Sequence, residues 1–198
     1  MTENSVPLFD FHTHNGQAEA GCAVINVPDR VLFLPCSFKP EEGKLYSAGL
    51  HPMLDGDWEK AWQGLRELVD QPAVAALGEC GLDKRSGHPM EEQCRYLALQ
   101  MELADRLHLP LILHCVRAWD ELLVVHRAHP SPMPRVVHGF RGKPELAAEL
   151  LKEGFFLSFG PTYNAEALRL CPQAKRFMET DDSGWTISQV AEKQAGDL

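Results

Sequence analysis

The length, composition and charge of the chain define its general class. With 198 residues it is long enough for one substantial hydrophobic core, and its hydrophobic content of 44% and charged content of 24% are ordinary for a globular protein. The net charge of −9, from 28 acidic and 19 basic residues, excludes the basic surface on which non-specific DNA binding usually depends.

Cysteine usage and hydropathy indicate the compartment. The six cysteines are scattered, and no C-x-x-C pair indicates a disulfide framework or a zinc knuckle. Residues 1–7 lack the basic and apolar regions of a signal peptide, and no apolar run approaches the ~20 residues that span a bilayer. We therefore expect a reducing, cytoplasmic location, no membrane partner and a monomer.

Short apolar runs alternate with amphipathic segments along most of the chain. Asp57 is a typical N-cap, and the apolar residues after it repeat at helical spacing. Pro144 and Gly154 bracket another helix, because proline suits a first helical position and glycine suits a helix end. Helices are predicted at 58–70, 89–107, 119–128, 144–153, 164–170 and 186–193, and strands at 8–14, 22–27, 45–50, 74–79, 110–114, 135–138, 155–159 and 176–181.

The segment between the second and third strands departs from this alternation. Residues 28–43 contain three prolines and no helical period, so we predict a reduced connection with an extra short strand at 31–34. Eight apolar strands, mostly separated by helices, favour parallel strands joined by crossovers, and eight such units close naturally into a barrel. We predict an α/β fold, a compact, distorted TIM (β/α)8 barrel with reduced helices, as a single domain over residues 1–198. The competing fold is an open doubly wound sheet, which predicts ligands at one switch point rather than on many strands.

The first predicted strand ends in the sequence Asp10-Phe11-His12-Thr13-His14. Alternate side chains of a strand share a face, so His12 and His14 can reach one metal ion. Asp10 is expected on the same face, where its carboxylate can hydrogen-bond an imidazole. The alternative is a strand that carries two solvent-facing histidines at its end.

Residues of metal-ligand type also end four later strands, among them Glu79, which we expect on one face with Ala75 and Leu77. In a closed barrel these strand ends meet at one rim, where the active sites of this fold lie. Imidazole and carboxylate ligands suit Zn²⁺, Mn²⁺ or related ions, and this many ligands suit two ions that share a bridging carboxylate. Each residue alone can be read as a satisfied core or loop side chain, but chance placement of the whole set is improbable. The candidate ligands are His12, His14, Glu79, His114, His138 and Asp181.

Six motifs, in one order along residues 8–183, carry a family resemblance. They are DFHTH at 10–14, GLHP at 49–52, GECGLD at 78–83, LPLILH at 109–114, HGFRG at 138–142 and ETD at 179–181. Together they resemble the TatD family of metal-dependent deoxyribonucleases, in the amidohydrolase-like barrel superfamily, and the short tail after the last motif resembles the shorter members. The resemblance implies a distorted TIM barrel, a two-metal site and hydrolysis of phosphodiesters, often of DNA from an end.

The resemblance also implies roles for the candidate ligands. Glu79 would bridge two divalent ions, either Zn²⁺, Mn²⁺ or Mg²⁺. Asp181 would orient or deprotonate the attacking water. Two such ions activate water and stabilise charge on the attacked phosphoryl group, which agrees with this chemistry. The first ion would be held by His12, His14, Glu79 and Asp181, and the second by Glu79, His114 and His138.

Three further residues are candidates for substrate binding. Arg117 and Arg141 follow the fifth and sixth strands and could clamp phosphate oxygens bidentately. His51 follows the third strand and could touch the substrate or the leaving group. The alternative for the arginines is an ordinary surface position, and the alternative for His51 is a role in loop packing.

Three functions are compatible with this pattern. The leading hypothesis is a two-metal hydrolase of phosphodiesters, with a nucleic acid or nucleotide, possibly a DNA end, as substrate. The second keeps the barrel and the metals but has an amide, a lactone or another small ester as substrate. The third is a metal-binding or interaction protein without catalytic activity. A substrate panel separates the first two, and tight metal binding without turnover would favour the third.

Overall fold

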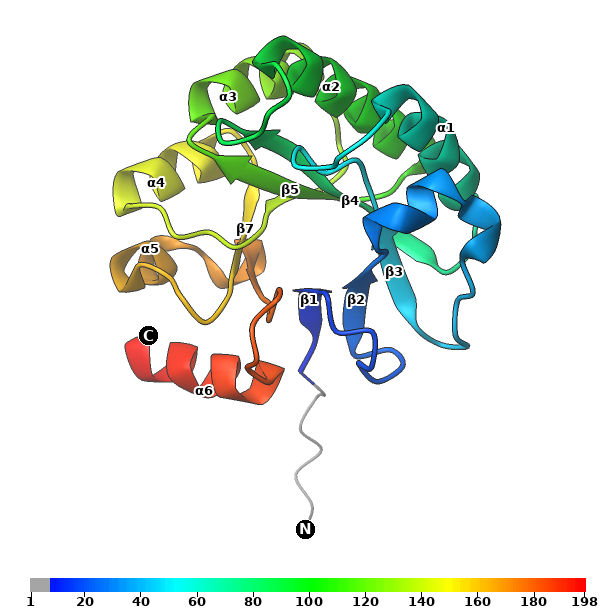
Figure 1. The fold of residues 1–198 in the computed structure, drawn as a ribbon. Coiled ribbons are helices and arrows are strands. Elements are labelled where there is room, and N and C mark those ends of the chain that lie inside the picture. The colour runs from blue at the N-terminus through cyan, green and yellow to red at the C-terminus, as the bar shows by residue number, and fades with distance from the viewer. Residues whose placement is uncertain (1–7) are drawn as a thin grey trace.

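The computed structural model describes residues 8–198, so the prediction that residues 1–7 are not a signal peptide lies outside the described residues. Figure 1 shows one strongly curved sheet with helices along its outer side. All eight strands follow one another in sequence order, and each pairs parallel with the next. The strands are β1 (Asp10–Thr13), β2 (Ala23–Asn26), β3 (Leu45–Ala48), β4 (Val74–Asp83), β5 (Leu111–Val116), β6 (Arg135–Val137), β7 (Phe156–Phe159) and β8 (Arg176–Met178). The predicted eight-stranded α/β barrel is confirmed.

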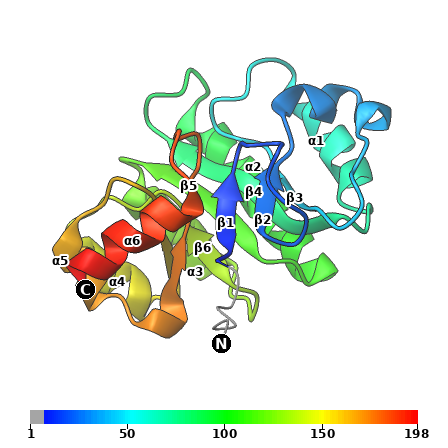
Figure 2. The ribbon, with the colours of Figure 1, turned by 90° about the horizontal axis from the view of Figure 1, so that it is seen from below.

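Within the described part of the chain six α-helices accompany the sheet, and several begin where the sequence indicates. The Asp57 carboxylate accepts a hydrogen bond from the Lys60 amide at 3.1 Å, so it caps the first helix as predicted. Figure 2 shows the last helix beside α5, at the side of the sheet where the chain ends. Within residues 8–198 no helix combines the length and apolar character needed to cross a membrane. The helices are α1 (Trp58–Leu68), α2 (Met90–Leu107), α3 (Trp119–Ala128), α4 (Pro144–Lys152), α5 (Ala165–Leu170) and α6 (Ile187–Asp197).

The connection between β2 and β3 is reduced, as predicted, but it contains no extra strand. Two short 3-10 helices, η1 (Asp29–Phe33) and η2 (Pro35–Ser37), replace a crossover helix. The strand predicted at 31–34 is therefore wrong. This apolar run forms one turn that packs against α1, where a side chain at Gly64 would lie 1.8 Å from the Leu32 carbonyl oxygen. Burial against a helix, rather than pairing in the sheet, explains the apolar residues here.

The barrel closes between β8 and β1 through a few specific contacts. Thr13 and Asp181 form an isolated parallel bridge, in which the Asp181 amide donates to the His12 carbonyl at 3.0 Å. The Asp10 carboxylate accepts hydrogen bonds from the Thr180 amide at 2.9 Å and from the Thr180 hydroxyl at 2.5 Å. These contacts hold the segment after β8 against β1, so Asp181 reaches the end of the first strand.

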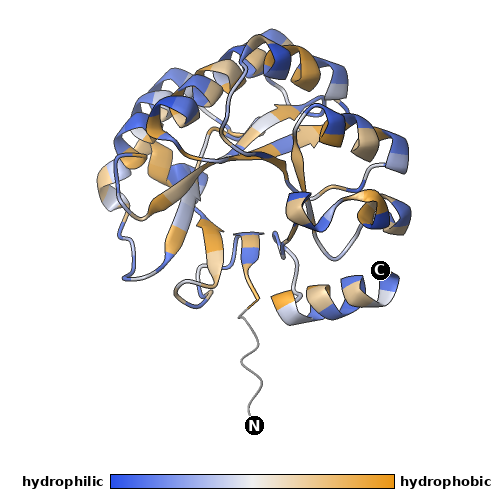
Figure 3. Ribbon diagram, turned by 180° about the vertical axis from the view of Figure 1, so that it is seen from behind, coloured by the Kyte–Doolittle hydropathy of each residue, from blue (hydrophilic) through white to orange (hydrophobic). Residues whose placement is uncertain are grey.

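Two separate hydrophobic cores fill the molecule, and Figure 3 shows hydrophobic residues along the strands and the sheet-facing sides of the helices. The larger core, which includes Leu77, Leu97 and Met101, lies between the sheet and the helices. The smaller core takes one residue from nearly every strand, so it lies inside the barrel and forms a floor below the strand ends. This inner layer consists of Phe11, Val24, Ala76, Ile112, Val136, Phe156 and Phe177.

Candidate metal centre

A layer of polar side chains lies directly above the inner apolar layer, at the C-terminal ends of the strands. On β5 the step from Ile112 to His114 keeps the regular alternation of a strand, and on β6 the step from Val136 to His138 does the same. A step of two residues leaves a side chain on the same face. Both imidazoles therefore face the barrel mouth, as the sequence predicts. The same step leads from Val24 to Asn26 and from Phe177 to Glu179.

Strand β1 brings its ligands to the same mouth by breaking the alternation. Its pairing with β2 shifts register between Asp10 and Thr13, and both Phe11 and His12 face inward. Asp10 consequently faces away from the histidines and binds Thr180 instead of an imidazole. The predicted common face of Asp10, His12 and His14 is wrong for Asp10 because the irregularity lies between them.

Strand β4 shifts register against both neighbours, against β3 between Val74 and Ala76 and against β5 between Leu77 and Cys80. Ala76 belongs to the inner layer and Leu77 to the outer core, yet Glu79 faces the mouth. The prediction that Ala75, Leu77 and Glu79 share a face is therefore wrong. The Asn26 side chain accepts a hydrogen bond from the Glu79 amide at 3.1 Å and holds the irregular segment in place.

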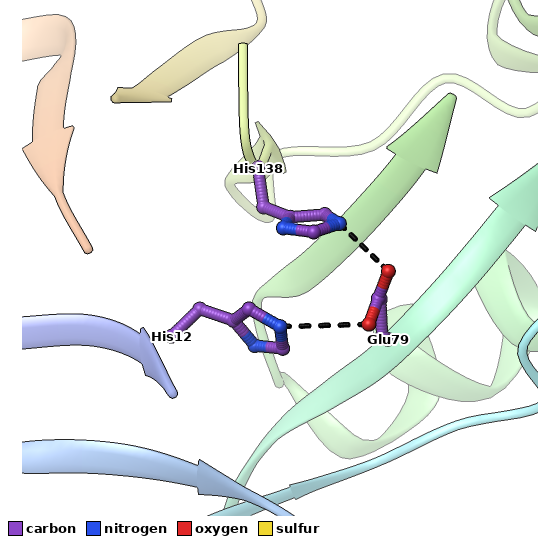
Figure 4. A group of neighbouring side chains, drawn as sticks. All are labelled: His12, Glu79 and His138. Atoms are coloured by element: carbon purple, nitrogen blue, oxygen red, sulfur yellow. Dashed lines mark ion pairs between the residues drawn. The ribbon is translucent and has the colours of Figure 1, made fainter. Parts of the chain in front are cut away.

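The Glu79 carboxylate is the centre of the site. Its Oε1 atom lies 2.7 Å from His138 Nε2, 2.8 Å from His114 Nδ1 and 3.1 Å from His51 Nε2. These histidines come from the ends of β6, β5 and β3, and Figure 4 shows the Glu79 carboxylate between His138 and His12. One carboxylate oxygen thus faces three imidazole nitrogens from three different strands.

The second oxygen of the carboxylate faces the histidine pair of β1. Glu79 Oε2 lies 3.5 Å from His12 Nε2 and 3.5 Å from His14 Nε2. The same two nitrogens lie 3.7 and 3.5 Å from Asp181 Oδ1. His12, His14, Glu79 and Asp181 therefore form a compact set of nitrogen and oxygen donors, as predicted.

Two further carboxylates fix the protonation of the imidazoles that face Glu79. His114 Nε2 lies 3.0 Å from Asp83 Oδ2, and His138 Nδ1 lies 3.3 Å from Glu179 Oε1. A neutral imidazole that donates its one proton to such an acceptor keeps a lone pair on its other ring nitrogen, and in His114 and His138 that other nitrogen faces Glu79. Two lone pairs within 2.8 Å of a carboxylate oxygen repel it unless a proton or a cation lies between them.

His51 has the opposite arrangement. Its Nδ1 atom accepts a hydrogen bond from the Met53 amide at 3.1 Å, so in the neutral ring the proton is on Nε2. That nitrogen faces Glu79 at 3.1 Å as a donor. This tautomer suits a hydrogen bond to Glu79 or to a bound oxygen better than metal ligation.

The orphaned nitrogens of His12 favour a cation. His12 is fully buried, and neither ring nitrogen has a hydrogen-bond partner within the described part of the chain. A buried polar atom without a partner costs about 1–3 kcal/mol, and ligation of an ion would remove that cost for one of the two nitrogens. The donors fall into four overlapping groups with ligand atoms within 4.8 Å of one another, which is more than one tetrahedral ion requires.

The close packing of these carboxylates and imidazoles shifts their pKa values. Burial opposes ionisation of Glu79, but the positive potential of His138 and hydrogen bonds from neighbouring histidines hold the pKa of Glu79 well below its usual value. Burial also opposes protonation of His138, yet Glu79 and Glu179 raise its pKa well above the usual value. The Glu79 hydrogen bond raises the pKa of His14 as well. The cluster thus attracts positive charge strongly, whether as protons or as metal ions.

Comparison with known proteins places the chain in a family. The model of the family described as TatD related DNase matches residues 38–183. The chain belongs to this family. It is 33% identical to the uncharacterized metal-dependent hydrolase YjjV of Escherichia coli K12, over 87% of this chain and 76% of that protein. It is 32% identical to the 3'-5' ssDNA/RNA exonuclease TatD of the same strain, over 68% of this chain but only 56% of the exonuclease, so it spans little more than half of that relative.

Solved structures share the fold of this TatD-related chain. The crystal structure of the YjjV protein of Escherichia coli K12 matches with a TM-score of 0.72 at 22% identity, over 96% of this chain and 95% of the other. A TatD family hydrolase from Entamoeba histolytica matches with a TM-score of 0.65 at 17% identity, over 89% and 74%. These likenesses agree with the barrel.

Both candidate arginines of this TatD-related chain line a cleft beside the metal centre. The cleft has a volume of about 860 Å³ and also contains His114, His138 and Asp181. Arg117 and Arg141 are exposed, and no ion pair occupies either guanidinium among the described residues. They therefore remain free to bind an anion near the site.

Sequence reasoning assigned no role to Asp83, Glu179 or Asn26, although all three shape the site. Burial alone would raise the pKa of Asp83, but hydrogen bonds from Arg85 and His114 hold it far below the usual value. Glu179 is fully buried and accepts from the Gly139 amide at 2.7 Å. Asp83 and Glu179 both lie within the family motifs, and this was the only signal available for them.

Proposed function

We propose that this chain hydrolyses phosphodiester bonds of nucleic acid with two divalent ions that share Glu79. The observation that carries the proposal is the convergence of two imidazole nitrogens, His114 Nδ1 at 2.8 Å and His138 Nε2 at 2.7 Å, on one oxygen of the Glu79 carboxylate. Only a positive charge resolves that arrangement, and divalent ions match the imidazole and carboxylate donors. We extend the proposal to the whole chain, residues 1–198, as one catalytic domain.

The donors divide naturally into two ion sites. Because the donors include four imidazoles, we propose Zn²⁺ or Mn²⁺ rather than Mg²⁺, which prefers oxygen ligands and retained water. Asp83 and Glu179 would act behind the ligands, each holding one ring nitrogen so that the other faces the ion. The first site would use His12, His14, Glu79 and Asp181, and the second Glu79, His114 and His138.

The residues around the ions supply the rest of the chemistry. When bound, the two ions polarise the phosphoryl group and make an attacking water more acidic. Asp181 is partly exposed at the mouth and stands where it can orient that water and accept its proton. His51 can donate from Nε2 to a substrate or leaving-group oxygen. Arg117 and Arg141 can bind the non-bridging phosphate oxygens.

Single-stranded nucleic acid is the substrate we propose. Curated relatives of the chain are named 3'-5' ssDNA/RNA exonucleases, and a relative that it covers more fully is named a metal-dependent hydrolase. The overall charge of −9 opposes binding of a long polyanion, whereas two free arginines beside the site suit one or two phosphates. A cytoplasmic location and a monomeric state stay predictions from the sequence.

Metal removal and reconstitution test this proposal. The protein is dialysed against a chelator, reloaded with Zn²⁺, Mn²⁺ or Mg²⁺, and assayed on a labelled single-stranded oligonucleotide, a lactone and an amide. We expect no activity without metal and oligonucleotide cleavage that returns with Zn²⁺ or Mn²⁺. Turnover of the lactone or amide, with none of the oligonucleotide, would replace this function with the other hydrolase chemistry. Full oligonucleotide cleavage by Glu79→Ala would overturn the proposal that two ions share Glu79.

A further inference from the structure

A second, smaller cavity opens beside the metal centre, next to the ends of β7 and β8. Its volume is about 260 Å³, and its lining includes Asp181, Arg141 and Trp185. Pockets for drug-sized ligands measure roughly 300–1,000 Å³, so this cavity suits one aromatic heterocycle and not a longer chain. It lies within reach of whatever occupies the proposed catalytic site, because Asp181 belongs to both.

Trp185 presents an aromatic surface to this cavity. Its side chain is 43% exposed, which is unusual for a tryptophan, and it lies outside all six family motifs. The Lys193 ammonium stands 5.8 Å from the Trp185 ring and 4.9 Å from the Tyr163 ring, and it donates to the Pro161 carbonyl at 2.7 Å. The Lys193 cation therefore faces the indole and links it to the neighbouring Tyr163 ring at the cavity wall.

The loop that carries Trp185 is anchored at both ends. At its start the Asp181 amide donates to the His12 carbonyl at 3.0 Å, and the Ser183 amide donates to the Thr180 carbonyl at 3.0 Å. At its end Thr186 forms a capping box at the start of α6. The indole thus has a defined position relative to Asp181, four residues earlier, without any folding on binding.

Arg141 stands between the two cavities of the site. It lines both the 260 Å³ cavity with Trp185 and the 860 Å³ cleft with Arg117, and Asp181 lines both as well. A phosphodiester bound at Arg141 and Asp181 therefore has room for one base on the Trp185 side. The remaining chain has room on the Arg117 side.

We propose that Trp185 is a stacking platform for the terminal nucleobase of a single-stranded substrate, with the base in the smaller cavity and the adjoining phosphate at Arg141. The inference rests on the proposed nucleic-acid hydrolysis and adds a binding site for the base to it. Stacking on an aromatic side chain tolerates every base, because each base has a π-face. The site would select for a terminal base without selecting its identity.

A binding experiment without metal tests the site independently of catalysis. Protein in excess chelator is titrated with deoxyadenosine 5'-monophosphate while tryptophan fluorescence is followed. We expect saturable quenching that Trp185→Phe removes and that Trp62→Phe, a control on α1, retains. Absence of saturable quenching in the wild type would overturn the proposal. So would quenching that survives Trp185→Phe but disappears in Trp119→Phe, since Trp119 lines the larger cleft.

A kinetic comparison measures the same contact in the loaded enzyme. The kcat/KM is measured for an oligonucleotide with an ordinary 3'-terminal nucleotide and for one whose 3'-terminal nucleotide is abasic. In the wild type we expect the missing base to cost roughly 5- to 150-fold, which corresponds to about 1–3 kcal/mol for one base–aromatic stack. In Trp185→Ala the ratio of kcat/KM between the ordinary and the abasic oligonucleotide should fall to near one. Trp185→Phe should restore most of the wild-type ratio.

The possible failures are distinguishable. An equal penalty for the abasic end in the wild type and Trp185→Ala would overturn the stacking site and leave the hydrolase function intact. If no variant cleaves either oligonucleotide, the proposed function fails, and the fluorescence titration still decides whether Trp185 binds a base.

Discussion

Two pairs of strands bring the candidate ligands to the proposed metal centre in different ways. Strands β5 and β6 are regular, and each places a histidine two residues above an inner apolar residue. In strands β1 and β4 the candidate ligands lie within a register shift, so His12 and Glu79 face the mouth out of phase with the strand. The irregular strands provide Glu79, which we propose is shared by two ions, and the fully buried His12.

Regular and irregular strands differ in where they can place a side chain. A regular strand holds side chains about 3.3 Å apart along its length, so it can present a histidine only at fixed heights. A bulge re-aims one side chain without moving the strand, and bulges are common next to active sites. The irregularity lets the short Glu79 side chain meet histidines from strands on both of its sides.

Disrupting the close approach of β4 to β5, just after the irregular segment, should produce the largest effect. Gly81 has a φ of +148°, and a Cβ there would lie 1.9 Å from the His114 carbonyl oxygen. We expect Gly81→Ala to lower the free energy of unfolding by about 3 kcal/mol or more, because strain and overpacking add. It should also reduce oligonucleotide cleavage more than 100-fold. Loss of a residue that only contacts a metal ligand usually costs about 10- to 100-fold.

Urea unfolding and initial rates measure both effects of Gly81→Ala. The matched control is Gly87→Ala, because no atom lies within 4 Å of a side chain at Gly87. The control should change the unfolding free energy by no more than about 0.5 kcal/mol. Equal behaviour of the two variants would show that the close approach of β4 and β5 does not matter.

On the regular strands, the second-largest effect is expected from substituting the carboxylates that hydrogen-bond His114 and His138. Asp83→Asn and Glu179→Gln remove the anions that hold the protons of His114 and His138. We expect each to weaken Zn²⁺ binding or cleavage by roughly 10- to 100-fold, the usual cost of losing such a partner. Competition with a chromophoric chelator measures the affinity, and Glu166→Gln on α5 serves as the control. Unchanged affinity in both variants would contradict the tautomers proposed here.

Smaller effects are expected at the arginines that follow the regular strands. Each of Arg117→Ala and Arg141→Ala should lower kcat/KM for an oligonucleotide by roughly 2- to 10-fold, since an exposed hydrogen bond contributes about 0.5–1.5 kcal/mol. Each should also reduce the dependence of log kcat/KM on log salt by about 0.7, the value for one phosphate contact on a single strand. Arg106→Ala, in the last turn of α2, is the control. Identical salt slopes in all variants would exclude phosphate contacts.

The smallest effect is expected far from the metal centre, at His126, which contacts Arg135 at the start of β6. Burial lowers the pKa of His126, whose ring accepts a hydrogen bond from Arg135 at 2.8 Å and donates to the Glu153 carbonyl at 3.0 Å. The unfolded chain therefore binds a proton first, so stability that is present above pH 6.5 is lost as the pH falls below it. Between pH 7.5 and 5.5 the wild type should lose less than about 1.4 kcal/mol relative to His126→Gln. Urea midpoints at both values measure this, and parallel pH profiles would contradict it.

The barrel could be predicted because its strands and helices differ in period and are separated by clear end signals. The helix Trp119–Ala128 begins and ends where the sequence indicates. The run at 31–34 could not be placed, because a short apolar segment has the same composition in a strand as in a turn packed on a helix. Only the close approach allowed by Gly64 on α1 distinguishes them.

The candidate ligands could be predicted from the sequence, but the carboxylates that contact them could not. His114 and His138 stand at strand ends in a readable pattern, whereas Asp83 and Glu179 lie 31 and 41 residues away from the histidines that they hold. Such pairs depend on the register of neighbouring strands, which a single sequence does not fix. The register shifts of β1 and β4 had no sequence signal beyond the glycines on either side of the Glu79-Cys80 pair.

The central claim is that Glu79 is shared by two ions, and metal stoichiometry tests it directly. Chelated protein is reloaded with Zn²⁺, freed of excess ion and analysed by inductively coupled plasma mass spectrometry, with Glu67→Gln on α1 as the matched control. The account predicts about two ions per chain in the wild type and in Glu67→Gln, and at most one in Glu79→Gln. Two ions retained by Glu79→Gln, or none bound by the wild type, would contradict it.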